Sequence, residues 1–313
     1  MESTTIPGTD LSVSRLCYGM GGFDRSFPIA DGLKLLGQFV DAGGNFVDSA
    51  HCYCFWSDGE SGASEQFVGA AVREFGRDRI VIATKGGHIG MNGYPRPDRF
   101  MSPELVRKDL DESLQRLGIP SVDIYYLHRD DPRMAVSEIV DFCSEFVSSG
   151  RVRFLGASNW SVDRYLAANA YAASKGIPPF VVLQNQWSLA SPGWSDMTQP
   201  GALRYVLESE LSSLTAHHVA VAPFSSTANG FFATDGARGH DYQSNKNRAR
   251  LAAAQALAKE RGATPNQIAL AYLLNQLFPV IPIVGTKDPE HLDDAVRATT
   301  VELSTADLAA LHL

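Results

Sequence analysis

Short apolar runs rich in β-branched and aromatic residues recur along the chain, and longer segments with helical spacing separate them. Several runs are continuously apolar instead of alternating, as expected for strands that helices cover on both faces. The candidate strands cover residues 16–18, 45–49, 80–84, 124–128, 153–158, 180–184, 219–224 and 280–284. This pattern predicts a parallel sheet.

The segments between these runs carry the start and stop signals of helices. Ser102 and Pro103 form an N-cap followed by proline at the first helical position, and Gly118 ends the same segment. Thr264 and Gln267 form a capping-box pattern that begins another helix. The other predicted helices cover residues 31–39, 64–73, 136–147, 161–175, 203–214, 248–259, 289–297 and 305–311.

Alternating strands and helices with short connections predict parallel strands joined by right-handed crossovers. Such units close most naturally into a (β/α)8 TIM barrel of the α/β class, and an open doubly wound sheet is the alternative. Before the first barrel strand, residues 4–6 and 11–14 flank a Gly-Thr-Asp turn, so we expect a β-hairpin that closes the bottom of the barrel. Barrels of this kind reach 313 residues as one domain, so we predict a single domain over residues 1–313.

Composition and charge narrow the class of partner. The formal net charge is −8 and no long basic block is present, so we expect a small-molecule ligand and neither a nucleic acid nor a membrane. The first residues have neither a basic start nor an apolar run, which predicts a cytoplasmic protein. Four cysteines in a chain of this length indicate reduced thiols and no disulfide framework.

Several of the predicted strands end in polar residues. In a parallel barrel, the C-terminal ends of the strands carry the chemistry. Asp48, Lys85 and His128 end the second, third and fourth strands, and Ser158 and Gln184 end the next two. Each residue alone has a structural explanation, such as a turn cap or a hydrogen-bonded core histidine. Their repetition at equivalent positions predicts a shared active site.

In order and spacing, these residues resemble the aldo-keto reductase family across nearly the whole chain. The matching pieces are residues 45–50, Tyr53, 83–85, 126–128, 156–159, Gln184 and 285–287. The resemblance implies a catalytic tetrad of Asp48, Tyr53, Lys85 and His128, a nicotinamide dinucleotide cofactor, and reduction of a carbonyl to an alcohol. No Gly-x-Gly-x-x-Gly follows the first strand, which independently disfavours a Rossmann dehydrogenase.

The tetrad residues have complementary roles in carbonyl reduction. Tyr53 is the natural proton donor, and we expect Lys85 to lower the pKa of its phenol, which is about 10 when free. Asp48 would keep Lys85 protonated in a dry pocket. A neutral His128 would donate a hydrogen bond to the carbonyl oxygen.

The resemblance also implies a cofactor site. Ser158, Asn159 and Gln184 match positions that hold the carboxamide, and Phe224 matches an aromatic residue that stacks on the nicotinamide, with Trp187 as the alternative. The further predicted contacts are Gly19, Ser225, Gly285, Thr286, Lys287, His291 and Asp294. We also expect the glycine-containing segment 230–245 to fold over the pyrophosphate.

A helix N-terminus beside Lys287 is a ready phosphate site, so NADP(H) is the predicted cofactor. The family often carries an arginine for the 2′-phosphate where this chain has His291. For this reason NAD(H) stays the alternative.

Aromatic residues in the loops after the strands either line a substrate site or only cover the barrel mouth. Phe55, Trp56 and Trp160 are the candidates for substrate contact, together with Arg129, and Trp194 falls in a similar loop. With acidic residues beside Arg129, the mixture would suit a sugar-like or other polar carbonyl compound.

Other kinds of site fit the sequence less well. His51, Cys52 and Cys54 lack the paired spacing of a zinc site, so no metal is predicted. A metal-dependent barrel hydrolase would need several histidines at strand ends, whereas only His128 lies at one. The remaining alternative is an NAD(P)H-binding regulatory or accessory barrel with little turnover.

Overall fold

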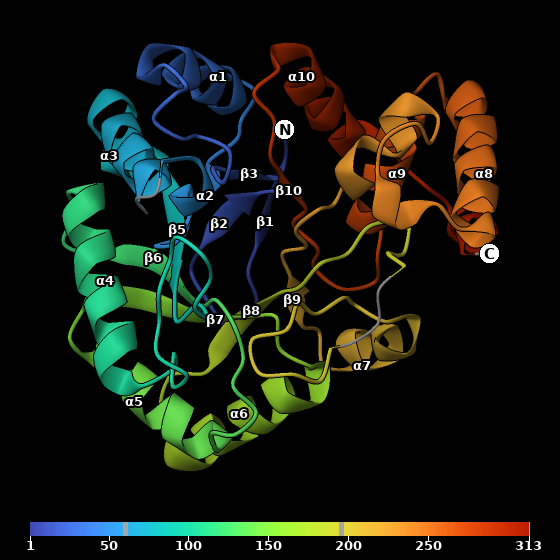
Figure 1. Cartoon of the computed structure of the whole chain (residues 1–313). Coiled ribbons are helices and arrows are strands. Elements are labelled where there is room, and N and C mark those ends of the chain that lie inside the picture. The colour runs from blue at the N-terminus through green and yellow to red at the C-terminus, as the bar shows by residue number, and fades with distance from the viewer. Residues whose placement is uncertain (59–61, 194–196, 313) are drawn as a thin grey trace.

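The computed structural model describes residues 1–58, 62–193 and 197–312, and eight parallel strands form its main sheet (Figure 1). In ring order the strands are β10, β3, β4, β5, β6, β7, β8 and β9. Their bounds are Cys17–Gly19 (β3), Phe46–Asp48 (β4), Val81–Gly86 (β5), Val122–Leu127 (β6), Val152–Ser158 (β7), Phe180–Gln184 (β8), Ala220–Val221 (β9) and Ile283–Val284 (β10). Each of them overlaps one of the predicted runs.

The two ends of this sheet meet and close it into a barrel. The Val221 amide donates to the Pro279 carbonyl over 2.9 Å, and the Ile281 amide donates to the Val221 carbonyl over 2.9 Å. Strand β9 is thereby joined to the segment that leads into β10. The predicted (β/α)8 barrel is confirmed, and the open doubly wound sheet was the wrong alternative.

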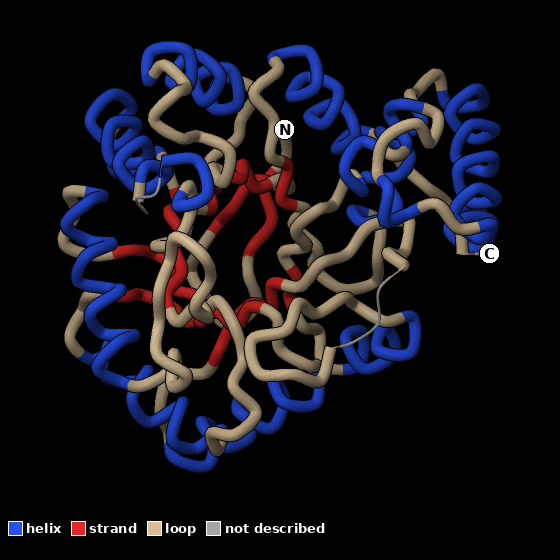
Figure 2. The backbone as a smooth tube through the Cα atoms, in the orientation of Figure 1, coloured by secondary structure: helices blue, strands red, loops and turns tan. Residues whose placement is uncertain are grey.

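Helices surround the barrel on its outer side (Figure 2). Their bounds are Ile29–Asp41 (α1), Phe55–Asp58 (α2), Ala63–Phe75 (α3), Pro103–Leu117 (α4), Val136–Ser148 (α5), Val162–Lys175 (α6), Leu211–Ala216 (α7), Asn245–Arg261 (α8), Pro265–Leu274 (α9), Pro289–Arg297 (α10) and Thr305–Leu311 (α11). The Ser102 and Thr264 side chains accept the predicted capping hydrogen bonds at α4 and α9. Within the described part of the chain, no helix combines the length and the apolar character needed to cross a bilayer.

The predicted helix over residues 203–214 is wrong in its first half. The Gln186 amide donates to the Arg204 carbonyl, and the Val206 amide donates to the Gln186 carbonyl, so residues 204–206 pair beside the sheet. A 3₁₀ turn, η2 (Glu208–Glu210), then leads into the short helix α7. Tertiary hydrogen bonds outweigh the helical spacing of the apolar residues here.

The N-terminal hairpin packs against the barrel interior. Strands β1 (Ser3–Thr5) and β2 (Ser12–Ser14) are antiparallel, and buried Ile6, Leu11 and Val13 share one apolar cluster with barrel residues such as Phe46. The Asn45 side chain accepts a hydrogen bond from the Ser14 amide and donates one to the Ser12 carbonyl. The predicted hairpin at the bottom of the barrel is therefore confirmed.

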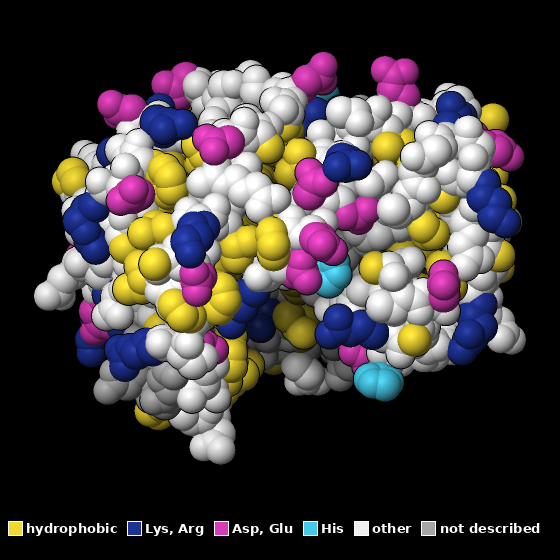
Figure 3. Space-filling view, turned by 90° about the horizontal axis from the view of Figure 1, so that it is seen from above, with side chains coloured by type: hydrophobic (Ala, Val, Ile, Leu, Met, Phe, Trp, Pro, Cys, Tyr) yellow, Lys and Arg dark blue, Asp and Glu magenta, His cyan; other side chains and the backbone are white. Residues whose placement is uncertain are grey.

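Acidic and basic side chains are interspersed over the face of the molecule seen in Figure 3. This matches the mixed charge pattern of the sequence, in which Asp and Glu outnumber Lys and Arg by 35 to 27. A ligand of this protein therefore has to be recognised by a local arrangement of side chains.

Shortening Ile6 to alanine tests how much the hairpin contributes to the barrel. Ile6 is completely buried, so Ile6→Ala should lower the free energy of unfolding by about 2 to 5 kcal/mol through lost burial and a residual cavity. Leu277→Ala is the control because Leu277 is 81% exposed, and it should change stability by about 0.5 kcal/mol or less. Urea denaturation measures both, and equal effects would show that the hairpin is not part of the core.

Candidate active site

One buried ammonium joins three of the predicted tetrad residues. Lys85 lies in β5 with no exposed side-chain surface, and its Nζ donates to Asp48 Oδ2 over 2.5 Å and to Tyr53 Oη over 3.0 Å. The third hydrogen bond goes to the Ser49 carbonyl over 2.7 Å. All three N–H groups of the ammonium are therefore bonded, as a buried cation requires.

The turn after β4 places Tyr53 over this ammonium. The Ser49 amide donates to the Ala83 carbonyl and the His51 amide donates to the Lys85 carbonyl, so the turn continues along β5. Lys85 Nζ lies 4.6 Å from the centroid of the Tyr53 ring. Gly21 lies against the same ring, because a Cβ atom at this position would come within 3.4 Å of Tyr53 Cε2.

Burial and Lys85 act in opposite directions on the phenol. Burial raises the pKa of Tyr53 to about 12, although the adjacent Lys85 charge lowers it. The net direction is opposite to the one expected from Lys85 alone, because the cost of a buried phenolate exceeds the attraction of the cation. Tyr53 is therefore protonated at neutral pH. Burial also opposes the Lys85 charge, but Asp48 and Tyr53 outweigh it and raise the pKa of Lys85.

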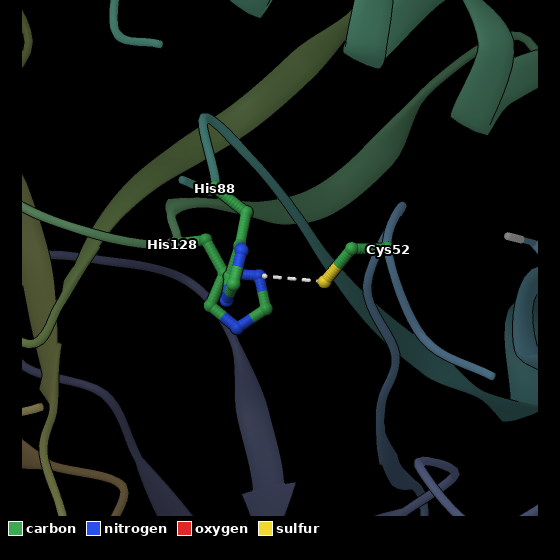
Figure 4. A group of neighbouring side chains, drawn as sticks. All are labelled: Cys52, His88 and His128. Atoms are coloured by element: carbon green, nitrogen blue, oxygen red, sulfur yellow. Dashed lines mark hydrogen bonds between the residues drawn. The ribbon is translucent and has the colours of Figure 1, made fainter. Parts of the chain in front are cut away.

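His128 follows β6 and faces Tyr53, with their ring centroids 5.7 Å apart and the planes at 79°. Burial, with the charges of Arg129 and Lys85 and the nearby His88, holds the pKa of His128 well below its usual range, so its imidazole is neutral. The Cys52 Sγ lies 3.6 Å from His128 Nδ1 (Figure 4). Burial raises the pKa of Cys52 to about 12, and a protonated thiol can donate to Nδ1. This hydrogen bond would leave the imidazole proton on Nε2.

Two neighbours of His128 were missed in the sequence. His88 lies in the loop after β5 with its ring centroid 4.6 Å from that of His128, and Cys52 directly precedes Tyr53. His51, Cys52 and Cys54, which are neighbours in the sequence, do not form a cluster in the structure. His51 bonds to Glu112 and Tyr94, and the Cys54 thiol bonds to the Gly21 carbonyl. Neither loop carries a periodic pattern that could have shown the new contacts.

Cys52, His88 and His128 offer ligand atoms that all lie within 4.8 Å of one another. A thiolate and two imidazoles suit Zn²⁺. The positive charges of Lys85 and Arg129 act on this cluster, however, and burial favours the protonated thiol. These charges disfavour a divalent cation, so we assign the cluster to the positioning of His128, to which Cys52 is hydrogen-bonded and against which His88 packs edge-on.

The predicted carboxamide residues lie beside the tetrad and are bonded to it. Asn159 Nδ2 donates to the His128 carbonyl over 3.0 Å and to Ser158 Oγ over 3.0 Å. Gln184 Nε2 donates to Asp48 Oδ1 over 2.9 Å. Asn159 and Gln184 thus help to orient tetrad residues in addition to any contact with a cofactor, and Ser158 holds the Asn159 amide.

Gly19, Phe224 and Ser225, three further predicted cofactor contacts, lie at or near the barrel interior, whereas Trp187 does not. Gly19 pairs with Asp48, and a Cβ atom at this glycine would come within 2.8 Å of Ile283 Cγ2. Phe224 is half-buried at the barrel interior and Ser225 follows it with a positive φ of 51°. Trp187 instead stacks on Phe278 in the outer core, with centroids 5.9 Å apart, so stacking by Trp187 on a nicotinamide is not supported.

A cavity of about 650 Å³ collects most of the other predicted cofactor residues. It is lined by Gly285, Thr286, Lys287, His291 and Asp294. Residues within 230–238, the first part of the segment 230–245 that was expected to cover the pyrophosphate, also contribute to the lining, together with residues 227 and 229. Two lining residues were not predicted. Arg238 brings a second cation, and Asn266 has a buried Oδ1 without a hydrogen-bond partner among the described residues.

Asp294 accepts three hydrogen bonds, from Thr264 Oγ1, Asn266 Nδ2 and Gln267 Nε2. Asp294 therefore joins the start of α9 to α10. A cofactor group that contacts Asp294, as predicted, would bind a carboxylate that already accepts these three hydrogen bonds. Lys287 lies over the Phe27 ring at 4.9 Å. Its ammonium belongs to the same cavity and stands directly before the start of α10.

The candidate substrate contacts divide into exposed and buried ones. Trp56 is 56% exposed and packs edge-on against Tyr53, and Phe55 packs beneath it. Trp160 is completely buried against Phe180, which removes it from the substrate contacts. Arg129 is half-buried near the tetrad, and Trp194 lies outside the described residues.

Comparisons with known proteins agree with this geometry. Residues 15–312 match the profile of the Aldo/keto reductase family. The chain is 31% identical over 307 residues to "Probable aldo-keto reductase 1" of Glycine max, covering 93% of this chain and 82% of that protein. It is 28% identical over 324 residues to "Aryl-alcohol dehydrogenase [NADP(+)]" of Phanerodontia chrysosporium, covering 94% and 77%.

A third relative and one solved structure extend these matches. The chain is 28% identical over 333 residues to "Norsolorinic acid reductase B" of Dothistroma septosporum, covering 98% and 79%. The crystal structure of a thermostable aldo-keto reductase, Tm1743, with the inhibitor epalrestat superposes with a TM-score of 0.74 at 22% identity, covering 100% of this chain and 99% of that one. At this identity the superposition supports the fold alone.

The buried imidazoles predict a loss of stability at acid pH. Burial and the charge of Arg129 lower the pKa of His88 to about 3, whereas a histidine in the unfolded chain titrates near pH ~6.5. Below that pH the unfolded chain binds a proton that the folded protein does not bind until about pH 3, so the free energy of unfolding falls as the pH falls. The slope is about 1.4 kcal/mol per pH unit for each such histidine.

Urea denaturation between about pH 7 and pH 4 measures this slope. His88→Gln should make it shallower by the contribution of one histidine, whereas His217→Gln, at an exposed position, should leave it unchanged. A His88→Gln variant with the pH dependence of the wild-type protein would contradict the buried neutral imidazole.

Proposed function

The chain belongs to the aldo-keto reductase family, and we propose that it is an NADP(H)-dependent oxidoreductase that reduces an aldehyde or ketone to an alcohol, with Tyr53 as general acid. The main support is the set of hydrogen bonds at Lys85, whose ammonium donates to both the Asp48 carboxylate and the Tyr53 hydroxyl. An aryl-alcohol dehydrogenase named for NADP(+) and a norsolorinic acid reductase among the relatives are consistent with this chemistry.

The donor set around the 650 Å³ cavity fits a dinucleotide phosphate. Lys287 and Arg238 provide cations, and Gly285 and Gly230 allow close approach of a ligand to the backbone. The unpartnered Asn266 Oδ1 can accept a hydrogen bond from an N–H or O–H group elsewhere on the nucleotide. Bound NADPH would supply the hydride. The cations favour the extra phosphate of NADP(H) over NAD(H).

Tyr53 then provides the proton. Its phenol is protonated at neutral pH, and negative charge that develops on the carbonyl oxygen makes that oxygen the better base. The O–H bond of Tyr53 breaks as the new O–H bond of the alcohol forms. The phenolate left behind is stabilised by the Lys85 ammonium, which Asp48 keeps charged.

His128 orients the carbonyl. Its neutral imidazole carries one proton, and the Cys52 thiol as donor to Nδ1 puts that proton on Nε2. From there the imidazole donates a hydrogen bond to the carbonyl oxygen that Tyr53 protonates. Burial keeps this imidazole neutral by lowering the pKa of His128, and the charges of Arg129 and Lys85 act in the same direction.

Replacing Tyr53 by phenylalanine tests the acid. Tyr53→Phe keeps the ring and removes the hydroxyl, so kcat for reduction of a simple aldehyde should fall by about two to four decades while the Kd for NADPH stays nearly unchanged. Tyr171→Phe is the control, since its hydroxyl bonds to Asp141 on the protein surface. NADPH oxidation measures kcat and protein fluorescence measures Kd. A Tyr53→Phe variant as active as the control would contradict the assignment, and NADPH binding without turnover in the wild-type protein would favour the accessory barrel.

Replacing Lys287 by alanine tests the cofactor preference. The change removes one charge-assisted hydrogen bond, so the KM for NADPH should rise about 10- to 100-fold and the KM for NADH much less. Lys34→Ala is the control because Lys34 pairs with Asp31 on the exposed face of α1. Steady-state kinetics with both cofactors measures the difference. An equal rise for NADPH and NADH would mean that Lys287 does not bind the 2′-phosphate.

A further inference from the structure

Five acidic side chains around the tetrad and in the loop after β6 are paired with cations in the described part of the chain. In each pair the carboxylate and its basic partner lie within hydrogen-bond distance. The pairs are Asp48 with Lys85, Glu65 with Arg116, Asp109 with Arg96, Asp130 with Arg164 and Asp131 with Arg133. These five carboxylates are therefore already engaged, and a further cation among them can stand without a carboxylate partner.

Arg129 is such a cation. Its Nε is buried and has no hydrogen-bond partner, and no hydrogen bond or ion pair within residues 1–58, 62–193 and 197–312 involves its guanidinium. The side chain as a whole is only half-buried. Its two terminal nitrogens also lack a partner among the described residues, but unlike Nε they are not fully buried. These two nitrogens are therefore open to a ligand.

Other titratable groups around Arg129 do not compensate its charge. Its charge acts on Cys52, His88 and His128, of which the first is a protonated thiol and the others are neutral imidazoles. The phenol of Tyr53 is protonated as well. Leaving a guanidinium in this position costs free energy that an anion would recover.

The cavity proposed for the cofactor phosphates is on the other side of the barrel from Arg129. Arg129 follows β6, whereas Lys287 and its cavity follow β10. In the closed ring, β6 lies four strands from β10 in either direction, which is the largest possible separation. An anion at Arg129 must therefore come from another ligand.

We propose that Arg129 binds an anionic group of the substrate, and that the physiological substrate is an aldehyde or ketone that also carries a carboxylate or a phosphate. The inference rests on the proposed reductase function, because it places the reacting carbonyl at Tyr53 and His128. Guanidinium groups bind both anions in a two-pronged geometry. Asp130 and Asp131 are among the acidic residues whose mixture with Arg129 suggested a sugar-like or other polar carbonyl compound. Their carboxylates are occupied by Arg164 and Arg133.

Two matched pairs of aldehydes test this proposal with NADPH and the full-length protein. The carboxylate pair is 4-carboxybenzaldehyde and its methyl ester, and the phosphate pair is glyceraldehyde 3-phosphate and glyceraldehyde. The charged member of at least one pair should have a kcat/KM about tenfold or more above that of its neutral partner, as expected for one charge-assisted contact. The pair that shows the preference identifies the anion.

Variants assign the preference to one side chain. Arg129→Met keeps the apolar stem and removes the charge, so the ratio of charged to neutral substrate should fall to near one, and Arg129→Lys should restore part of it. Arg107→Met is the control, because Arg107 in the first turns of α4 pairs with exposed Glu145 and its loss removes one positive charge without a described contact to the tetrad. The ratio should survive in this variant.

The outcomes separate the two proposals. If no aldehyde is reduced, the proposed function fails. If both members of each pair are reduced equally well, or if folded Arg129→Met keeps the preference of the wild-type protein, the reductase function stands and the role of Arg129 is refuted. Thermal unfolding of each variant shows whether it is folded.

Discussion

The buried ammonium of Lys85 is the constraint on which the geometry of the barrel mouth depends. Its three N–H groups bond to the Asp48 carboxylate, the Ser49 carbonyl and the Tyr53 hydroxyl, and none of them faces solvent. Moving any of the three acceptors would leave part of a buried cation unpaired, which raises the free energy of the folded protein by several kcal/mol. The position of the phenol is thus fixed by electrostatics as much as by packing.

The closed barrel makes this ion pair possible. Asp48 and Lys85 lie on adjacent strands, and Asp48 pairs with Ala83, two residues before Lys85, so that both side chains come to the same end of the sheet. The second Asp48 oxygen accepts from Gln184 on β8, which lies four strands from β4 around the ring. An eight-stranded barrel is narrow enough for side chains of opposing strands to touch. A flat sheet with the same strands would not bring Gln184 to Asp48.

The sequence predicted the fold and the residues of the tetrad more completely than their neighbours. Strands and helix caps are encoded by short local patterns of residues. Residues at the C-terminal ends of the strands lie close together because the barrel brings these ends to one face. The helix expected from residue 203 was wrong because its first residues bond to Gln186, a contact that local spacing does not show. Cys52, His88 and Arg238 lie in loops without periodicity, and their contacts depend on how distant loops fold together. The net pKa shift of Tyr53 likewise depends on burial, which a sequence does not give.

The distribution of charge around the mouth gives the two ends of the site different tasks. Lys287 follows β10 and Arg129 follows β6, on opposite sides of the ring, and Asp48 neutralises the ammonium between them. The imidazoles of His88 and His128 stay neutral partly because the charge of Arg129 acts on them. An anion bound at Arg129 would weaken that effect. If the proposed roles of Arg129 and His128 hold, binding of a substrate charge and protonation of His128 would be coupled through a single guanidinium.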